Sequence, residues 1–173
     1  VVANYDPKFE IPYLLGGLIL AESPDHGEAS LKVFARGRVH HPQDWRFPFY
    51  IGYTHYFCLG DPEAAGRAMA EAGRMAGSPA YLTGLASRMF SEARKPETAL
   101  AFLDSVARQE TDPARRAALE RRIRDVVVER DLQLLERSLE RYREKTGSLP
   151  MELPDPVREG ILAAIPAEPN GGN

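Results

Sequence analysis

The chain has 173 residues, of which 43 % are hydrophobic and 27 % charged, and its formal net charge is −3. This length predicts one domain with at most a small appendage, and the apolar fraction excludes a disordered chain. The mildly acidic balance argues against a dedicated nucleic-acid binder. No apolar run approaches the roughly 18 residues of a membrane span. A single cysteine, Cys58, excludes an internal disulfide and a zinc cluster built on thiolates.

The chain opens Val1-Val2-Ala3-Asn4, with no initiator methionine and no charged-then-apolar signal pattern. This opening is consistent with an upstream segment that the sequence does not include. Such a segment could be a signal peptide, a membrane anchor or more of the domain, and the residues do not distinguish these three.

Small residues recur through the first two thirds of the chain, each time with a large apolar residue at the same phase. Gly17, Gly52 and Ala86 follow one another at intervals of 35 and 34 residues. The same two intervals separate the equivalent members of three successive sets of residues. These sets are Ser30/Phe34/Gly37, Ala65/Met69/Ala72 and Ala99/Leu103/Val106. Small side chains at a helix crossing let two backbones approach closely, while a large one fills the groove between them. The pattern therefore predicts three pairs of antiparallel helices in close contact.

Capping signals place the ends of these helices. Asp61-Pro62 and Asp112-Pro113 each put an aspartate before a proline at the first helical position, and Asp25 with Glu28 resembles a capping box. No alternation of apolar and polar residues lasts long enough to predict a strand. The predicted helix pairs span residues 9–23 and 27–39, 45–58 and 62–76, and 79–93 and 96–108.

These residues resemble the tetratricopeptide repeat family over about residues 9–110. The resemblance implies an all-α fold whose residues 1–112 form a short right-handed solenoid of three helix-turn-helix units, at about 9–42, 43–78 and 79–111. The sequence departs from the family pattern in its first helices, where the small residue stands one position early. The aromatic residue that is usual near the start of those helices is replaced by Leu14, Phe49 and Thr83.

Residues 113–146 are predicted to form one long helix, because positions 114–145 contain neither glycine nor proline. Its basic residues form either a phosphate-binding face or a solvated surface with i,i+4 ion pairs. Its apolar residues are spaced 4, 3, 4 and 3 apart, which makes one continuous stripe that consists of Val128, Leu132, Leu135, Leu139 and Tyr142. We therefore expect the long helix to cap the open end of the repeats with this stripe, and the alternative is a seam with a partner helix.

Residues 147–173 form a proline- and glycine-rich tail, with a short helix predicted from Asp155 to Ala164. Together with Arg141 and Tyr142, the segments Gly147-Ser148-Leu149-Pro150, Gly160-Ile161-Leu162 and Pro169-Asn170-Gly171 look like the end of type II secretion pseudopilins. This second resemblance implies a bacterial protein of the cell envelope, either periplasmic or anchored through an upstream segment, in preference to a cytoplasmic one.

No motif predicts catalysis. The four histidines lie in a capping turn, at a helix end and within an aromatic helix, without a second clustered set of ligands. The sequence has no phosphate-binding loop, no nucleophile elbow and no isolated pair of carboxylates suited to acid–base work. We therefore expect a protein that is not an enzyme and that uses no cofactor and no metal.

The feature that best predicts binding is residues 45–57, which hold seven aromatic side chains. Matching the first helices to the groove positions of the family gives a candidate partner-binding groove of Phe47, Tyr50, Thr54, Phe57, Tyr81 and Arg88. Aromatic residues and arginine are enriched at binding hot spots. We expect Phe47, Tyr50 and Arg88 to be partly exposed, so that Tyr50→Ala leaves stability nearly unchanged. The alternative is that the aromatic residues fill the core.

The sequence therefore favours a non-enzymatic protein-interaction module or scaffold, whose partner is a segment of another protein and not a nucleic acid. The alternative is a structural subunit of a bacterial cell-envelope assembly, such as a secretion or pilus system. The family's basic clamp for a terminal carboxylate is absent, because its lysine and asparagine positions hold Tyr50 and Thr54.

Overall fold

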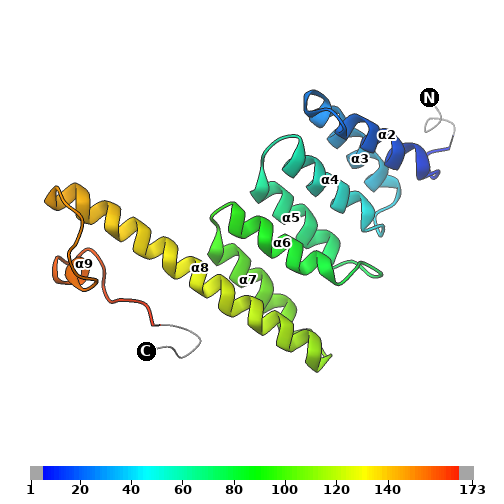
Figure 1. The fold of residues 1–173 in the computed structure, drawn as a ribbon. Coiled ribbons are helices and arrows are strands. Elements are labelled where there is room, and N and C mark those ends of the chain that lie inside the picture. The colour runs from blue at the N-terminus through cyan, green and yellow to red at the C-terminus, as the bar shows by residue number, and fades with distance from the viewer. Residues whose placement is uncertain (1–5, 168–173) are drawn as a thin grey trace. The chain divides into compact units, whose positions relative to one another are not determined.

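The structure is a computed structural model that describes residues 6–167. Within these residues the chain forms eight α-helices, one 3-10 turn and no strand (Figure 1). The all-α prediction is therefore confirmed. The chain divides into two compact units, one that runs to Leu103 and one that begins at Asp104. The sequence features at Val1–Asn4 and at Pro169–Gly171 lie outside the described residues.

Consecutive helices of the first unit pack against one another, α2 on α3, α3 on α4, α4 on α5 and α5 on α6 (Figure 1). Every helix end lies within three residues of its predicted position, so the six predicted helices are present. The helices are α2 (Ile11–Ala21), α3 (Gly27–His40), α4 (Arg46–Phe57), α5 (Pro62–Gly73), α6 (Tyr81–Glu92) and α7 (Pro96–Ala107), with a 3-10 turn at Pro24–His26.

Small residues lie at the helix crossings, as the repeat pattern predicts. A Cβ atom added to Gly17 would collide with the ring of Phe34, which is fully buried. The equivalent position 35 residues later is Gly52, where an added Cβ would lie 2.8 Å from Cγ of Met69. The first two hairpins therefore use the same contact, a glycine in one helix against a large side chain in the next. In the third hairpin Ala86 and Leu103 are both fully buried.

Two buried hydroxyl groups connect the first hairpin to the second. The Ser30 hydroxyl donates to the carbonyl oxygen of Gly17 at 2.9 Å and lies 3.1 Å from the Thr54 hydroxyl. Thr54 in turn donates to the carbonyl oxygen of Tyr50 at 2.9 Å. Both side chains are fully buried, so the cost of desolvating their hydroxyls is offset by these hydrogen bonds.

Two of the three predicted caps are confirmed. Asp61 accepts a hydrogen bond from the backbone N–H of Ala64 at 2.9 Å, and Asp112 accepts one from the N–H of Arg115 at 2.8 Å. The capping box at Asp25 was wrong. Asp25 lies within the 3-10 turn, and α3 begins at Gly27 without a side-chain cap, because that turn already leads the chain into the helix.

The second unit is built on the long helix α8 (Pro113–Thr146), which has the predicted bounds. It ends at Gly147, whose φ of 78° is the left-handed conformation that glycine adopts at helix ends. The short helix of the tail, α9 (Asp155–Arg158), is shorter than predicted. Gly160 has a φ of 70°, which ends helical geometry before Ala164. The apolar stripe on α8 is partly covered, with Leu132 and Leu139 exposed.

Candidate partner-binding surface

Two of the six predicted groove residues are buried in the core, and for them the expectation of a groove position was wrong. The ring of Phe47 fills the space above Gly37 and stacks on His41, with 5.6 Å between the ring centroids. Thr54 is turned toward α3, where its hydroxyl meets that of Ser30. Both residues are fully buried because they pack α4 against the first hairpin.

The other four predicted residues reach the surface to different extents. Phe57 and Tyr81 are 61 % and 60 % exposed, and Arg88 is exposed. Tyr50 is half-buried, because its ring stacks on that of Phe34 with 5.5 Å between centroids and an interplanar angle of 13°. Tyr50 thus belongs partly to the core, which makes the expected tolerance to Tyr50→Ala unsound.

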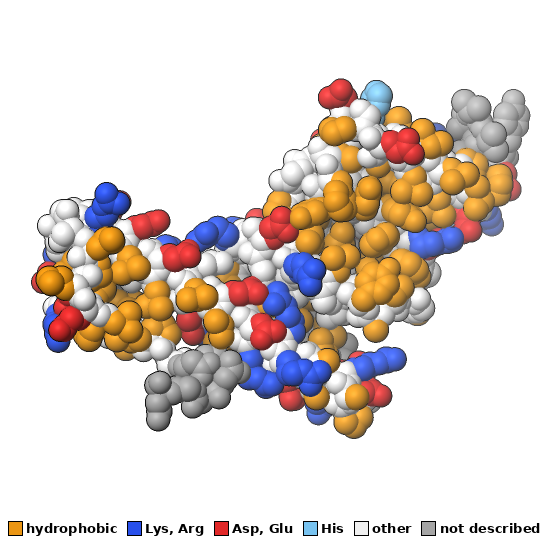
Figure 2. All heavy atoms as spheres, viewed as in Figure 1, with side chains coloured by type: hydrophobic (Ala, Val, Ile, Leu, Met, Phe, Trp, Pro, Cys, Tyr) orange, Lys and Arg blue, Asp and Glu red, His pale blue; other side chains and the backbone are white. Residues whose placement is uncertain are grey.

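The structure reveals a different row of aromatic side chains on the outer side of α4. Trp45, Phe49, Tyr53 and Phe57 are each four residues apart, and Tyr56 lies beside Phe57. Their rings contact one another in two groups, with centroid separations of 6.1 Å for Trp45–Phe49 in the first and of 4.6 Å for Tyr53–Phe57 and 4.8 Å for Tyr56–Phe57 in the second. Figure 2 shows hydrophobic side chains gathered over α2 and α4. We refer to these five residues as the aromatic ridge.

The spacing of four residues along the ridge was present in the sequence and could have identified it, because residues four apart share a helix face. Matching to the family's groove positions led instead to Phe47, Tyr50 and Thr54, which face the preceding hairpin. Four of the five ridge residues are partly exposed, and Phe57 is exposed. No part of the ridge is therefore closed off within its own unit.

The ridge is joined to α6 by a hydrogen bond. The Tyr56 hydroxyl lies 2.9 Å from both carboxylate oxygens of Glu92, to which it donates. This hydrogen bond to the carboxylate raises the pKa of Tyr56, with smaller contributions from burial and from the charge of Glu92. The contact places the C-terminal part of the ridge next to the last turn of α6.

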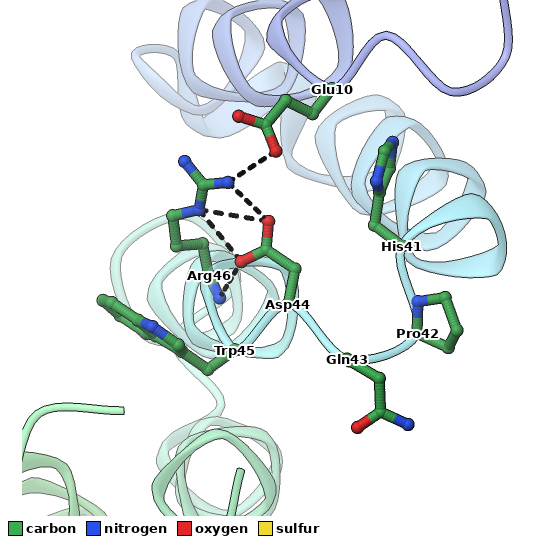
Figure 3. Close-up of a pocket in the computed structure, with 7 residues that line it drawn as sticks. All are labelled: Glu10, His41, Pro42, Gln43, Asp44, Trp45 and Arg46. Atoms are coloured by element: carbon green, nitrogen blue, oxygen red, sulfur yellow. Dashed lines mark hydrogen bonds and ion pairs between the residues drawn. The ribbon is translucent and has the colours of Figure 1, made fainter. Parts of the chain in front are cut away.

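At the other end of the ridge an open pocket of about 540 Å³ lies where α4 begins (Figure 3). Residues 41–46 form most of its wall, with Trp45 shared between pocket and ridge, and Glu10 closes it from the start of α2. The Nε2 atom of His41 is buried and makes no hydrogen bond with any other residue of the described chain.

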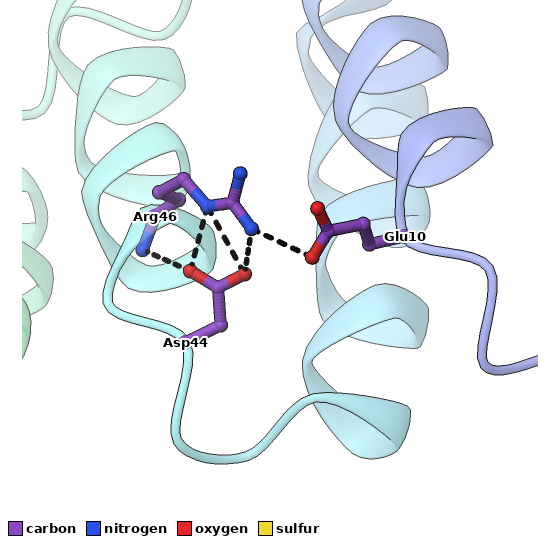
Figure 4. Close-up of polar contacts among 3 residues, drawn as sticks. All are labelled: Glu10, Asp44 and Arg46. Carbon is purple, nitrogen blue, oxygen red and sulfur yellow. Dashed lines mark hydrogen bonds and ion pairs between the residues drawn. The ribbon is translucent and has the colours of Figure 1, made fainter.

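The charged groups of the pocket are held in a fixed arrangement around Arg46 (Figure 4). Its guanidinium donates to both oxygens of Asp44, with Nη2 at 2.6 Å from Oδ2 and Nε at 2.9 Å from Oδ1. Nη2 also lies 2.6 Å from Oε2 of Glu10. Burial raises the pKa of Asp44, but hydrogen bonds from Arg46 and its charge outweigh burial and lower that pKa overall.

Two carboxylates and one guanidinium give this group a net charge of −1 at neutral pH. The pocket therefore suits a basic or amide-bearing side chain better than an anion. The bidentate geometry also fixes Arg46, so that the pocket wall is preorganised.

Within residues 6–167, no three histidine, cysteine, aspartate or glutamate side chains lie close enough together to hold a metal ion. No helix in the same range is both long and apolar enough to cross a membrane.

Models of protein families, curated protein sequences and solved structures all give no match to this chain.

Proposed function

We propose that the chain is a non-enzymatic protein-interaction module. Three tetratricopeptide-like hairpins form its first part, and a long helix follows them in the sequence. The module would bind a segment of another protein along the aromatic ridge of α4. The single observation that carries this proposal is the ridge itself, in which two groups of contacting, partly exposed aromatic rings follow one another along one helix face.

The repeat interpretation is supported by equivalent contacts at equivalent positions. Gly17 opposes Phe34 and Gly52 opposes Met69, and each of these positions is separated from its counterpart by 35 residues. Stacked hairpins of this kind present one side of their first helices as an extended surface. The first helix of the second hairpin is α4, so its outer face lies in the middle of that surface.

The binding interpretation is supported by the composition of the surface. Tryptophan, tyrosine and arginine dominate binding hot spots because they combine a large contact area with a polar tip. The ridge supplies one tryptophan and two tyrosines, and α6 adds Tyr81 and Arg88. The acidic pocket beside Trp45 gives the surface a polar anchor at one end. An extended segment with apolar side chains and one basic side chain suits this combination.

Selection from a peptide library tests the proposal while the partner is still unidentified. A library of random 12-residue peptides displayed on phage is selected against the intact chain, and enriched peptides are synthesised and titrated by isothermal calorimetry. We expect Phe57→Ala to weaken them by roughly 30-fold, since an aromatic anchor is often worth about 2 kcal/mol. Phe57 is 61 % exposed, so the same change should alter the free energy of unfolding by no more than about 0.5 kcal/mol.

Val39→Ala provides the control, because Val39 is also highly exposed but lies on α3, away from the ridge. Selected peptides should bind the Val39→Ala variant within threefold of the unchanged chain. A selection that enriches no peptide, or peptides that bind the Phe57→Ala variant as tightly as the control, would refute the proposal.

A further inference from the structure

The outer face of α2 exposes a row of large apolar side chains. Ile11, Leu15 and Ile19 are 42 %, 55 % and 65 % exposed, and they lie four residues apart on one side of the helix. An exposed apolar row of this kind is costly for an isolated chain, since each side chain would gain from removal from water. Packing within the single chain therefore does not explain why these three apolar side chains are exposed.

The same positions are covered in the second hairpin. Tyr50 and Thr54 stand 35 residues after Leu15 and Ile19, and both pack on α3, Tyr50 against Phe34 and Thr54 against Ser30. The row on α2 is thus the face that the second hairpin uses to pack on the first, whereas the equivalent Gly84 and Arg88 of the third hairpin are exposed. Figure 1 shows α2 at the end of its unit, and its described contacts are with α3, α4 and the 3-10 turn.

The row is self-complementary. If a second α2 packs antiparallel to the first with Leu15 at the two-fold axis, Ile11 faces Ile19 of the second copy and Leu15 faces its own equivalent. Ridges formed by residues four apart can interdigitate in this way at a crossing angle of about −50°. A symmetric interface requires that one patch match itself, and a row centred on Leu15 meets that requirement.

The charges at the two ends of α2 fit the same arrangement. Lys8 precedes the helix and Glu22 follows it, each seven residues from Leu15, so Lys8 of one copy approaches Glu22 of the other. Both are exposed, and neither side chain forms an ion pair with another residue of the described chain. The antiparallel pairing therefore forms two ion pairs, each between Lys8 of one copy and Glu22 of the other. A parallel pairing would instead place the two lysines together and the two glutamates together.

We propose that the outer face of α2 binds a second copy of this chain, as an antiparallel dimer about Leu15. An α-helix of 11 residues is only about 16 Å long, so the interface is small and belongs to the weak, reversible class. Association is expected at micromolar concentrations of the chain.

Sedimentation equilibrium of the full chain, from about 1 to 300 μM, tests the dimer. We expect a reversible monomer–dimer equilibrium that Leu15→Glu abolishes, because two carboxylates would then meet at the two-fold axis. Leu132→Glu is the matched control, since Leu132 on α8 is 54 % exposed and thus as accessible as Leu15. Circular dichroism of both variants checks that they remain folded, as expected for exposed positions.

Charge reversal tests the orientation. Lys8→Glu and Glu22→Lys should each raise the dimer dissociation constant severalfold, because each creates two repulsive pairs, and the double variant should restore it. A wild-type chain that stays monomeric at 300 μM would overturn the proposal. A dimer that survives Leu15→Glu but is lost with Leu132→Glu would overturn it too, by placing the interface on α8. We expect Phe57→Ala, on α4, to leave this equilibrium unchanged, so the test of the dimer is independent of the proposed peptide binding.

Discussion

Two adjacent glycines of α2, Gly16 and Gly17, are predicted to respond differently to substitution by alanine. The substitution should raise the free energy of unfolding at Gly16 and lower it at Gly17. Both lie within the helix, so alanine gains the same intrinsic helix propensity at each, about 0.5–1 kcal/mol. At Gly16 the nearest atom to an added Cβ is Cγ1 of Val33 at 3.8 Å, an ordinary contact. We therefore expect Gly16→Ala to raise the free energy of unfolding by about 0.5–1 kcal/mol.

At Gly17 the added methyl group would collide with the ring of Phe34. That ring is fully buried and stacked on Tyr50, so it has no free space into which to move. Overpacking of this kind costs about 1–3 kcal/mol, which exceeds the propensity gain and leaves a net loss of about 1 kcal/mol.

The two variants should therefore differ by about 2 kcal/mol. For a chain of this size the difference corresponds to about 4–8 °C in the midpoint of a thermal melt followed by circular dichroism at 222 nm. Both are measured at the same protein concentration. If the melting midpoint of Gly17→Ala is equal to or higher than that of Gly16→Ala, the assigned crossing of α2 and α3 is refuted.

Two further predictions concern packing and charge. Ala65→Leu and Ala72→Leu should each lower the free energy of unfolding in urea by about 1–3 kcal/mol, because both alanines are fully buried at helix crossings; tolerance at both positions would show that the crossings are misplaced. Asp44→Asn should cost about 1 kcal/mol at pH 7, a modest value because Arg46 is partly exposed. Since the pKa of Asp44 is lowered in the folded protein, its ionised form stabilises the fold above the unfolded pKa of about 3.9, and this stabilisation is lost as the pH falls through the folded value. The difference between wild type and Asp44→Asn should thus shrink progressively as the pH falls below the unfolded pKa of about 3.9, and a difference that does not change there would contradict the role of the ion pair.

The helices were predictable because their signals are local. Aspartate-proline pairs mark the starts of α5 and α8, and Gly147 marks the end of α8. The small residues at intervals of 35 and 34 also identified the crossings, because only a missing side chain admits Phe34 or Met69. The helix predicted to reach Ala164 ended early, since the sequence does not show that Gly160 adopts a left-handed conformation.

The candidate surface was harder to predict, because burial of an aromatic residue depends on which neighbour its helix face meets. Phe47 and Phe49 are both phenylalanines on α4, yet only Phe47 points at Gly37 and is enclosed. Nothing in the two positions taken alone distinguishes them. The pocket beside Trp45 was also missed, because Glu10 and Asp44 are 34 residues apart and meet at Arg46 only when the hairpins stack.

The two buried hydroxyls between the first hairpins have a consequence for assembly. Ser30 and Thr54 together carry two protons, yet three oxygen–oxygen contacts connect them with each other and with the carbonyls of Gly17 and Tyr50. A slide of α4 along α3 by one turn would separate the Thr54 hydroxyl from that of Ser30. Each hydroxyl would keep its hydrogen bond to a carbonyl oxygen, so the slide would forfeit only the contact between the two hydroxyls, at about 0.5–1.5 kcal/mol. The hydroxyl pair therefore favours one stacking position of the second hairpin on the first.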